Sequence, residues 1–279
     1  MQEIGINKRL KRIFSHSNGK VVIAPIDDSL LVGAINGLEN MKTKVEQIIS
    51  GSPNAIIAFQ GTIKHYADII GNIPTILNLT ASTTNIQHTR KSLISTVELA
   101  IQLGVEAVAV HVNLSSIYEH EMLNILGRAS MDCHRYGIPL MAIMYPRGEN
   151  TDGSDNNYYE LRENNNTEYT NLVAHAARVG MELGADIIKT QYTGNTESFK
   201  KVVCACAPIP VVVAGGIPIE IDKLLDVAEG TIKAGGAGVS FGRNIYTRKN
   251  PLQYIQAVKD IVLDDMSKKE ALERFNKYL

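Results

Sequence analysis

The most reactive group that the sequence suggests is a lysine at the end of a short apolar segment, Ala185-Asp-Ile-Ile-Lys189. An amine in apolar surroundings has a lowered pKa, because its charged form loses solvation. A neutral amine can attack a carbonyl group and form an imine, whose protonated form withdraws electrons from the neighbouring carbon. Such a group would make or break carbon–carbon bonds without a metal. Lys189 could equally extend into solvent or bind a phosphate, and its position alone does not decide.

Two residues, Tyr145 and Asp27, could move protons during such chemistry. Tyr145 follows another apolar segment, in Met144-Tyr-Pro-Arg-Gly148, and its phenol could exchange a proton with a substrate, although a lone tyrosine is more often structural. Asp27 could bind a substrate hydroxyl or accept its proton. We expect Asp28 to point to the other side, because side chains alternate along a strand. Loop capping or ion pairs would explain the two aspartates equally well.

Two glycine-containing pairs, Gly215-Gly216 and Gly242-Arg243, predict a phosphate site. Glycine lets backbone N–H groups approach an anion closely, and Arg243 would add a positive charge. A tight turn is the ordinary explanation for either pair alone. Because the pairs follow two consecutive apolar segments, they indicate together a phosphorylated substrate.

The histidines and cysteines do not suggest a metal site. The seven histidines form no His-x-His or His-Glu-x-x-His pattern, and the three cysteines form no Cys-x-x-Cys pair. We expect reduced thiols, no metal and no organic cofactor. His111, beside Asn113, and Arg147 both follow apolar segments. We therefore expect both side chains to contact the substrate.

The composition is that of a globular enzyme. The chain has 279 residues, of which 44% are hydrophobic and 20% charged, and its net charge is −1. It therefore has no general attraction for nucleic acid or for an anionic membrane. It has neither 18 consecutive apolar residues nor the apolar run of a signal peptide near its beginning. These features predict a cytoplasmic protein.

The elements that must position these residues are short strands alternating with helices. Eight apolar segments rich in valine and isoleucine recur about every 31 residues, which is the size of a strand–helix unit. Between them, residues 45–49, 93–101 and 173–183 show apolar positions at helical spacing. Segments that are apolar throughout are typical of parallel strands buried on both faces. The eight predicted strands are 21–26, 55–59, 75–79, 107–112, 140–144, 185–189, 211–214 and 238–241.

Eight such units predict an α/β protein that forms one closed (β/α)₈ TIM barrel, with residues 1–279 as a single domain. An open dinucleotide-binding sheet would have a Gly-x-Gly-x-x-Gly turn after the first strand, where this chain has residues 27–33 without that motif. In a barrel the carboxyl ends of the strands share one rim, so the candidate residues would meet there. We expect the polar segment 149–166 to form a lid-like loop, and residues 251–279 to form two helices that pack on a partner subunit.

Four motifs together resemble the archaeal-type class I aldolases over nearly the whole chain. The resemblance implies a (β/α)₈ barrel with Lys189 as the imine-forming residue, Tyr145 as general acid and base, and Asp27 as the partner carboxylate. It also implies a homo-oligomer, because members of the family form rings of subunits, often decamers. The motifs are Asp186-Ile-Ile-Lys-Thr-Gln-Tyr-Thr-Gly194, Met144-Tyr-Pro-Arg-Gly148, Val110-His-Val-Asn113 and Val211-Val-Val-Ala-Gly-Gly216.

The sequence departs from the family pattern in two places. The family usually has Asp-His-Gly after the first strand, where this chain has Asp27-Asp28-Ser29. Fructose-bisphosphate aldolases of the family often carry a tryptophan shortly before Tyr-Pro-Arg-Gly, and this chain contains no tryptophan. The resemblance therefore favours the heptulosonate-forming branch.

That branch joins a three-carbon unit from a keto-sugar phosphate to L-aspartate 4-semialdehyde, or uses dihydroxyacetone phosphate as the donor. The product is a seven-carbon amino-keto precursor of aromatic or aminohydroxybenzoate-type compounds. In the predicted lid, Arg162 could pair with the carboxylate of this acceptor. Two alternatives stay open. One is a fructose 1,6-bisphosphate aldolase, and the other is a barrel that binds a sugar phosphate without catalysis.

Overall fold

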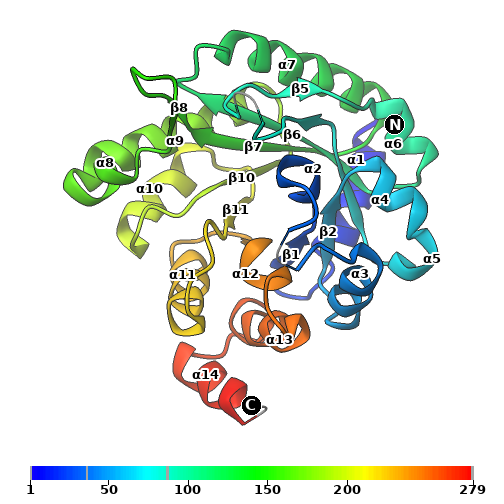
Figure 1. The fold of residues 1–279 in the computed structure, drawn as a ribbon, viewed down its shortest axis with the longest axis vertical. Coiled ribbons are helices and arrows are strands. Elements are labelled where there is room, and N and C mark those ends of the chain that lie inside the picture. Colours follow the sequence, from blue (N-terminus) through cyan, green and yellow to red (C-terminus); the bar gives the residue numbers. More distant parts are fainter. Residues whose placement is uncertain (1, 36, 86–87, 278–279) are drawn as a thin grey trace.

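A computed structural model describes residues 2–35, 37–85 and 88–277 of the chain (Figure 1). Eight parallel strands form its centre, and all eight lie at the segments predicted from the sequence. They are β1 (Val21–Pro25), β2 (Ala55–Ala58), β3 (Thr75–Asn78), β6 (Ala107–Leu114), β7 (Leu140–Pro146), β10 (Ile187–Gln191), β11 (Val211–Ala214) and β12 (Gly238–Ser240). The strands pair in the order β1, β12, β11, β10, β7, β6, β3, β2 and close on themselves, so the predicted (β/α)₈ barrel is confirmed.

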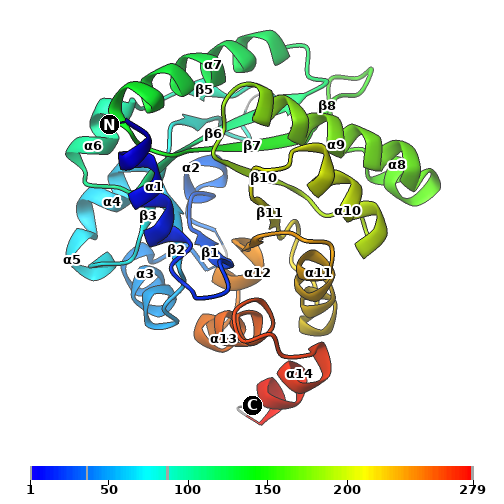
Figure 2. The same cartoon turned by 180° about the vertical axis from the view of Figure 1, so that it is seen from behind.

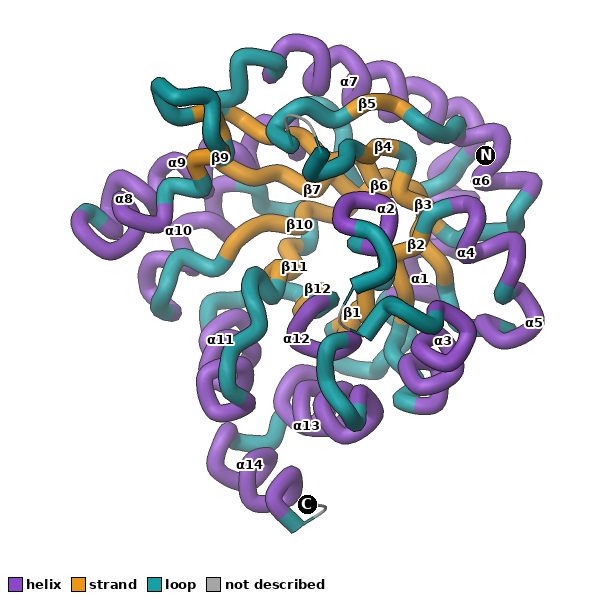
Figure 3. Tube along the Cα trace, viewed as in Figure 1, coloured by secondary structure: helices purple, strands orange, loops and turns teal. Residues whose placement is uncertain are grey.

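Helices form the outer layer around these strands (Figure 3). The longest, on the side of β6, β7 and β10, are α7 (Glu119–Tyr136) and α9 (Asn166–Glu182). The others are α1 (Gln2–Ile13), α2 (Ser29–Val32), α3 (Met41–Ser50), α4 (Gln60–His65), α5 (Ala67–Ile70), α6 (Val97–Gln102), α8 (Tyr159–Asn164), α10 (Thr196–Ala205), α11 (Ile221–Lys233), α12 (Arg243–Tyr246), α13 (Pro251–Val262) and α14 (Lys268–Asn276).

The alternation of side chains along the strands produces two separate apolar cores. One core lies inside the barrel and contains Val21, Ile23, Ile143, Ile187 and other inward-facing residues, all of them buried. The second, larger core fills the space between the strands and the surrounding helices. Because both faces of each strand are buried, the strand segments are apolar throughout, as the sequence indicated.

Helix α1 contributes to the inner core although it precedes the barrel in the sequence. Ile13 is fully buried within that core, and Leu10 and Phe14 pack against it. In Figure 2 α1 lies across the end of the barrel opposite to α2. The Arg9 Nη1 atom donates a hydrogen bond to the Gly137 carbonyl oxygen at 3.1 Å, which ties α1 to the end of α7. Helix α1 therefore closes one end of the barrel.

Two small antiparallel sheets were not predicted. Strands β4 (Thr80–Ala81) and β5 (Ser92–Leu93) pair with each other after β3, and β8 (Gly148–Glu149) pairs with β9 (Asp155–Asn156) after β7. The prediction of a helix over 93–101 is wrong at its beginning, because Leu93 belongs to β5 and α6 starts only at Val97. The segment 149–166, predicted as a loop, contains part of the second hairpin and the helix α8.

The predicted pair of C-terminal helices corresponds to α13 and α14. Helix α14 begins with a capping box, in which the Ser267 side chain accepts from the Glu270 backbone N–H and the Glu270 side chain accepts from the Ser267 N–H. Residues 278 and 279 of the predicted second helix lie outside the described residues. No helix in the described part of the chain is both long and apolar enough to cross a membrane.

Candidate active site

One large cavity opens at the carboxyl ends of the barrel strands. Its volume is about 870 Å³. The inward-facing positions of the strands lead directly to it. Pro25, two residues after the inward-facing Ile23, and Lys189, two residues after Ile187, both line the cavity, and Asp27 lies just beyond the end of β1. The cavity is lined by all ten residues that were predicted to form the site, namely Asp27, Asp28, His111, Tyr145, Arg147, Lys189, Gly215, Gly216, Gly242 and Arg243.

Lys189 lies at the cavity with its side chain buried. It lies in β10, opposite Ile143 of β7 and Val212 of β11, and only 7% of its surface is exposed. Burial lowers the pKa of its amine, while the negative charges of Asp27 and Asp28 act in the opposite direction. The amine therefore loses its proton more easily than a lysine in water, and its neutral form is the nucleophile.

Asp27 faces the same part of the cavity. Its Oδ2 atom accepts a hydrogen bond from Asn78 Nδ2 at 2.8 Å. Burial raises the pKa of the Asp27 carboxyl, whereas the positive charge of Lys189 lowers it. The carboxyl group can thus hold a proton that Lys189 releases, and Asn78 fixes its orientation. Asn78 was not predicted, although it is the inward-facing residue that ends β3.

Tyr145 lies at the end of β7, against the ring of His111. The two ring centroids are 4.9 Å apart and the ring planes meet at 81°. Burial, with the nearby Asp27 carboxylate, raises the pKa of the Tyr145 phenol, so it stays protonated and can donate a proton.

His111 is neutral, because burial and the surrounding cations hold its pKa well below the usual value. Its Nε2 atom lies 3.0 Å from Asn113 Oδ1. The Asn113 amide donates to the Thr89 carbonyl oxygen at 2.7 Å, so its own oxygen is the acceptor for His111. Nε2 of His111 therefore carries the proton and Nδ1 is left as an acceptor.

The predicted orientation of Asp28 is wrong. It lines the same cavity as Asp27, because β1 ends at Pro25 and the alternation along that strand no longer applies. Asp28 instead directly precedes α2 with helical backbone angles (φ −77°, ψ −21°), and its side chain makes no capping hydrogen bond. Its Oδ2 accepts a hydrogen bond from Tyr246 Oη at 2.7 Å and lies 4.0 Å from Arg243 Nε.

The two glycine pairs lie beside each other on the rim formed by β11 and β12. Gly216 has a left-handed backbone (φ +65°), and a side chain built there would meet no atom within 4 Å, so the glycine borders open space. The Asn244 side chain holds this turn, since its Nδ2 donates to the Gly215 carbonyl oxygen at 2.8 Å and its Oδ1 accepts from the Ile219 N–H at 2.8 Å. Gly242 and Arg243 face the cavity from the start of α12.

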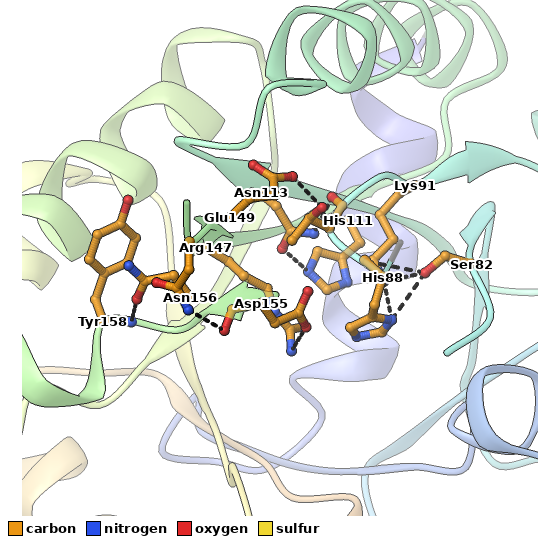
Figure 4. A network of polar contacts seen from close by, with 12 residues as sticks. Ser82, His88, Lys91, His111, Asn113, Arg147, Glu149, Asp155, Asn156 and Tyr158 are labelled. Carbon is orange, nitrogen blue, oxygen red and sulfur yellow. Dashed lines mark hydrogen bonds and ion pairs between the residues drawn. The ribbon is translucent and has the colours of Figure 1, made fainter. Parts of the chain in front are cut away.

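Arg147 reaches the cavity from the turn after β7. Its Nη2 atom forms an ion pair of 3.0 Å with Asp155 Oδ2, which lies on β9 (Figure 4). The hairpin is held by Glu149, whose carboxylate accepts hydrogen bonds from the Thr89 hydroxyl, from Ser116 Oγ at 2.8 Å and from the Ile117 N–H at 3.0 Å.

Arg162, by contrast, lies exposed on α8 and does not line the cavity. The prediction that it pairs with a substrate carboxylate is therefore not supported by its place in the structure.

Besides Asn78, three lining or adjoining residues were missed, namely Ser82, His88 and Lys91. All three come after β4 and before β5, and His88 and Lys91 line the cavity. Sequence reasoning could have found Lys91 only by its place after the third strand, since a polar loop lysine is ordinarily solvated.

The expectation that no metal takes part stays a prediction. No group of three or more histidine, cysteine, aspartate or glutamate side chains suited to a metal ion occurs among residues 2–35, 37–85 and 88–277. The side chains that converge on the cavity are instead a lysine, a tyrosine and a carboxyl group, which suit covalent catalysis through an amine.

The profile of the DeoC/LacD family of aldolases matches residues 21–248. The chain belongs to this family. The described barrel covers the matched region from β1 to the turn after α12, so the match includes every predicted site residue. The protein is accordingly an aldolase of the class I type, as the motifs of the sequence suggested.

Relatives of this DeoC/LacD aldolase include two curated enzymes. The chain is 37% identical over 273 residues to 2-amino-3,7-dideoxy-D-threo-hept-6-ulosonate synthase 1 of Archaeoglobus fulgidus, covering 97% of this chain and 95% of the relative. It is 31% identical over 258 residues to 2-amino-4,5-dihydroxy-6-oxo-7-(phosphonooxy)heptanoate synthase of Streptomyces griseus, covering 91% and 89%.

The likeness to solved structures of aldolases agrees with this assignment. An archaeal fructose-1,6-bisphosphate aldolase, with its catalytic lysine bound to the carbinolamine intermediate of the substrate, superposes with a TM-score of 0.80 at 27% identity. The alignment covers 92% of this chain and 98% of that structure. The expected class of Schiff-base aldolases within the DeoC/LacD family is therefore confirmed.

Proposed function

We propose that this aldolase joins a three-carbon keto unit to L-aspartate 4-semialdehyde, with Lys189 as the imine-forming residue. The observation that carries the proposal is that the buried Lys189 and the partly buried Asp27 and Tyr145 line one cavity, with shifted pKa values. An amine of lowered pKa, a carboxyl of raised pKa and a protonated phenol supply a nucleophile and two groups that exchange protons.

In the first half of the reaction, the Lys189 amine adds to the carbonyl carbon of the donor. The resulting carbinolamine loses water and leaves an iminium ion. A proton then leaves the adjacent carbon, and the electron pair of that C–H bond forms an enamine. Asp27 is placed to hold a proton during these steps, because its carboxyl shares the buried end of the cavity with the lysine. With a keto-sugar phosphate as donor, cleavage of a carbon–carbon bond forms the enamine instead.

In the second half, the enamine carbon attacks the aldehyde carbon of the acceptor. The aldehyde oxygen becomes an alkoxide and takes a proton from the Tyr145 phenol, which its raised pKa keeps protonated. Hydrolysis of the iminium ion releases the product and returns the free amine of Lys189. His111, packed against the Tyr145 ring, holds the phenol in place. No metal or organic cofactor takes part in this sequence.

The donor would be held by its phosphate at the rim of β11 and β12. Gly216 borders open space within the cavity, and backbone N–H groups there can approach an anion closely. Arg243 adds a positive charge beside them, although part of it is offset by Asp28 at 4.0 Å. The donor that these features favour is dihydroxyacetone phosphate or a keto-sugar phosphate.

The choice of acceptor is supported by the names of the two synthases. In the product of the Streptomyces enzyme, the ketone is at C6 and the aldol hydroxyl at C4, so the new bond joins C4 to C5. Breaking that bond gives aspartate 4-semialdehyde and dihydroxyacetone phosphate. Breaking the C4–C5 bond in the product of the archaeal enzyme also gives aspartate 4-semialdehyde, together with a three-carbon unit that carries no phosphate. The two relatives thus share the acceptor and differ in the donor.

A second function, cleavage of fructose 1,6-bisphosphate, is favoured by the likeness to the archaeal aldolase structures. A barrel that binds a sugar phosphate without catalysis would need no buried lysine and tyrosine together. The homo-oligomer and the cytoplasmic location expected from the sequence remain predictions.

The test uses one preparation of the enzyme. Borohydride reduction in the presence of dihydroxyacetone phosphate, followed by peptide mass spectrometry, should place the donor fragment on Lys189. The value of kcat/KM for condensation with L-aspartate 4-semialdehyde should then exceed that for cleavage of fructose 1,6-bisphosphate. If cleavage is faster by about tenfold or more, a preference of roughly 1.4 kcal/mol, fructose-bisphosphate aldolase becomes the function. A fragment on a peptide without Lys189 would refute the assignment of the lysine.

A further inference from the structure

A second buried lysine lies at the cavity, away from the proposed imine site. Lys91 precedes β5, and only 2% of its surface is exposed. Its Nζ atom donates to Ser82 Oγ at 2.6 Å and lies 3.2 Å from His88 Nδ1 (Figure 4). These two contacts use two of the three hydrogens of the ammonium group, which leaves one for a ligand. The proposed aldol mechanism gives Lys91 no role.

His88 adds a second donor to the same wall. Its Nδ1 atom faces Lys91 Nζ and Ser82 Oγ, each at 3.2 Å, and therefore serves as the acceptor. Burial and the charge of Lys91 lower the pKa of His88 to about 3, so the ring is neutral. A neutral ring whose Nδ1 accepts must carry its proton on Nε2, which leaves an N–H group for another partner. His88 lines the cavity.

Arg147, which follows β7, is the third member of the group that Lys91 and His88 begin. One side of its guanidinium is paired with Asp155 at 3.0 Å. Its Nε atom is buried and has no hydrogen-bond partner within the described part of the chain. A buried donor without a partner is costly, and an anionic ligand would satisfy it. Among the charged neighbours of Lys91, Arg147 lowers the pKa of the amine most, so the two cations act on each other.

Lys91, His88 and Arg147 lie at a different part of the barrel rim from the two glycine pairs, which we call the glycine rim. Lys91 follows β3 and Arg147 follows β7, whereas the glycine pairs follow β11 and β12. In the closed order of strands, Lys189 on β10 lies between β7 and β11. A substrate anchored at the glycine rim would therefore extend past Lys189 toward Lys91 and Arg147.

The charged residues that line the cavity suit a substrate that has a second anionic group. Lys91, Arg147, Lys189 and Arg243 line it together with the carboxylates of Asp27, Asp28 and Asp155. Burial, helped by Arg147, lowers the pKa of Lys91 to about 7, while the three carboxylates act in the opposite direction. A bound anion would offset the repulsion between the two cations and stabilise the charged form of Lys91.

We propose that Lys91, His88 and Arg147 form a second anion subsite, which binds the anionic end of the acceptor aldehyde. This subsite rests on the proposed aldol function, because it orients an acceptor toward an enamine on Lys189. The ligand chemistry is a terminal carboxylate or phosphate. A carboxylate would come from aspartate 4-semialdehyde, and a phosphate would come from glyceraldehyde 3-phosphate.

The test compares three acceptors with dihydroxyacetone phosphate as donor: L-aspartate 4-semialdehyde, D-glyceraldehyde 3-phosphate and uncharged butanal. Lys91→Met removes the charge and keeps the length of the side chain. We expect kcat/KM for a charged acceptor to fall roughly 10- to 100-fold, mainly through KM, and butanal to change by less than about threefold. A loss confined to the semialdehyde identifies a carboxylate subsite, and a loss confined to the triose phosphate identifies a phosphate subsite.

The matched control is Lys64→Met, which removes an exposed lysine on α4 and should leave all three acceptors unchanged. Equal losses with charged and uncharged acceptors in Lys91→Met would overturn the subsite. If that variant does not fold, the α-methyl ester of aspartate 4-semialdehyde tests the wild-type enzyme. Esterification should lower kcat/KM roughly tenfold or more. An ester that reacts as fast as the free acid, on an enzyme that uses glyceraldehyde 3-phosphate no better than butanal, would overturn the subsite.

Borohydride trapping of the donor distinguishes a failure of the proposed subsite from a failure of the proposed function. An imine that forms on Lys189 in wild type and in Lys91→Met, with an unchanged preference among acceptors, overturns the subsite alone. Absence of any trapped donor on wild-type Lys189 overturns the proposed function itself.

Discussion

Burial acts in opposite directions on the two ionisable groups at the base of the cavity. It lowers the pKa of the Lys189 amine and raises that of the Asp27 carboxyl, and their mutual attraction only partly offsets both shifts. Both groups therefore move toward their neutral forms. The fold prepares the amine for attack before any substrate arrives, which the residue types alone could not show.

This pair has a consequence for the pH dependence of imine formation. Because the folded pKa of Lys189 lies below the ordinary value of 10.5, the neutral fraction of the amine grows as pH rises and reaches one half below pH 10.5. The initial rate of borohydride trapping with dihydroxyacetone phosphate should thus rise with pH and begin to level off at a lower pH than for a lysine in water. A rate that still increases tenfold per pH unit at pH 10.5 would contradict the lowered pKa.

A substitution of Tyr145 tests proton transfer separately from imine formation. Tyr145→Phe keeps the ring against His111 and removes the hydroxyl, so kcat for the aldol reaction should fall roughly 10²- to 10⁴-fold. Trapping of the donor on Lys189 should persist. Tyr136→Phe, on the outer surface of α7, is the control and should leave turnover unchanged. Turnover of Tyr145→Phe within a few-fold of wild type would make this tyrosine structural.

At the level of residues, strand ends were the most informative feature of the sequence. Lys189 and Tyr145 were predicted because each closes an apolar segment, and all predicted site residues except Arg162 line one cavity. The orientation of Asp28 was mispredicted, because the chain turns into α2 directly after β1 and side chains no longer alternate there. Lys91 was missed because the tertiary fold buries this loop lysine, and no local sequence pattern indicates that burial.

The turn between β11 and α11 is the element that most directly tests the phosphate site. Gly216→Ala places a methyl group in open cavity space at a left-handed backbone position, which costs about 1 kcal/mol of stability. We expect a higher KM for dihydroxyacetone phosphate, and little change for unphosphorylated dihydroxyacetone if it reacts. Steady-state kinetics with both donors measures this difference. Equal effects on the two donors would mean that Gly216 serves only the turn.

Elements with a repeated apolar pattern were predictable, and short polar ones were not. The eight barrel strands stand out because burial on both faces makes them apolar throughout. The hairpins β4–β5 and β8–β9 have only two residues per strand, and their side chains are largely polar. What holds the second hairpin is Glu149, through contacts with Thr89 and Ser116 that lie far away in the sequence.

For the whole molecule, the proposed mechanism predicts independence from metal ions. The iminium ion on Lys189 withdraws electrons in place of a metal, so activity should survive exhaustive dialysis against a chelator. The measurement is turnover before and after dialysis, with the metal content of the protein determined at both points. Loss of activity that zinc restores would move the enzyme to a metal-dependent class and give the histidines a different role.

The position of α1 has a consequence for how the chain is made. A ribosome releases α1 before the barrel strands, yet this helix packs against an inner core built from strands β1 to β11. The barrel closes only when β12 pairs with β1, which joins Val21 to Gly238. Contacts between such distant parts of a sequence form slowly. Helix α1 is therefore made before the barrel but is among the last elements to find all its neighbours, and a partly synthesised chain exposes its apolar face to the rest of the cell.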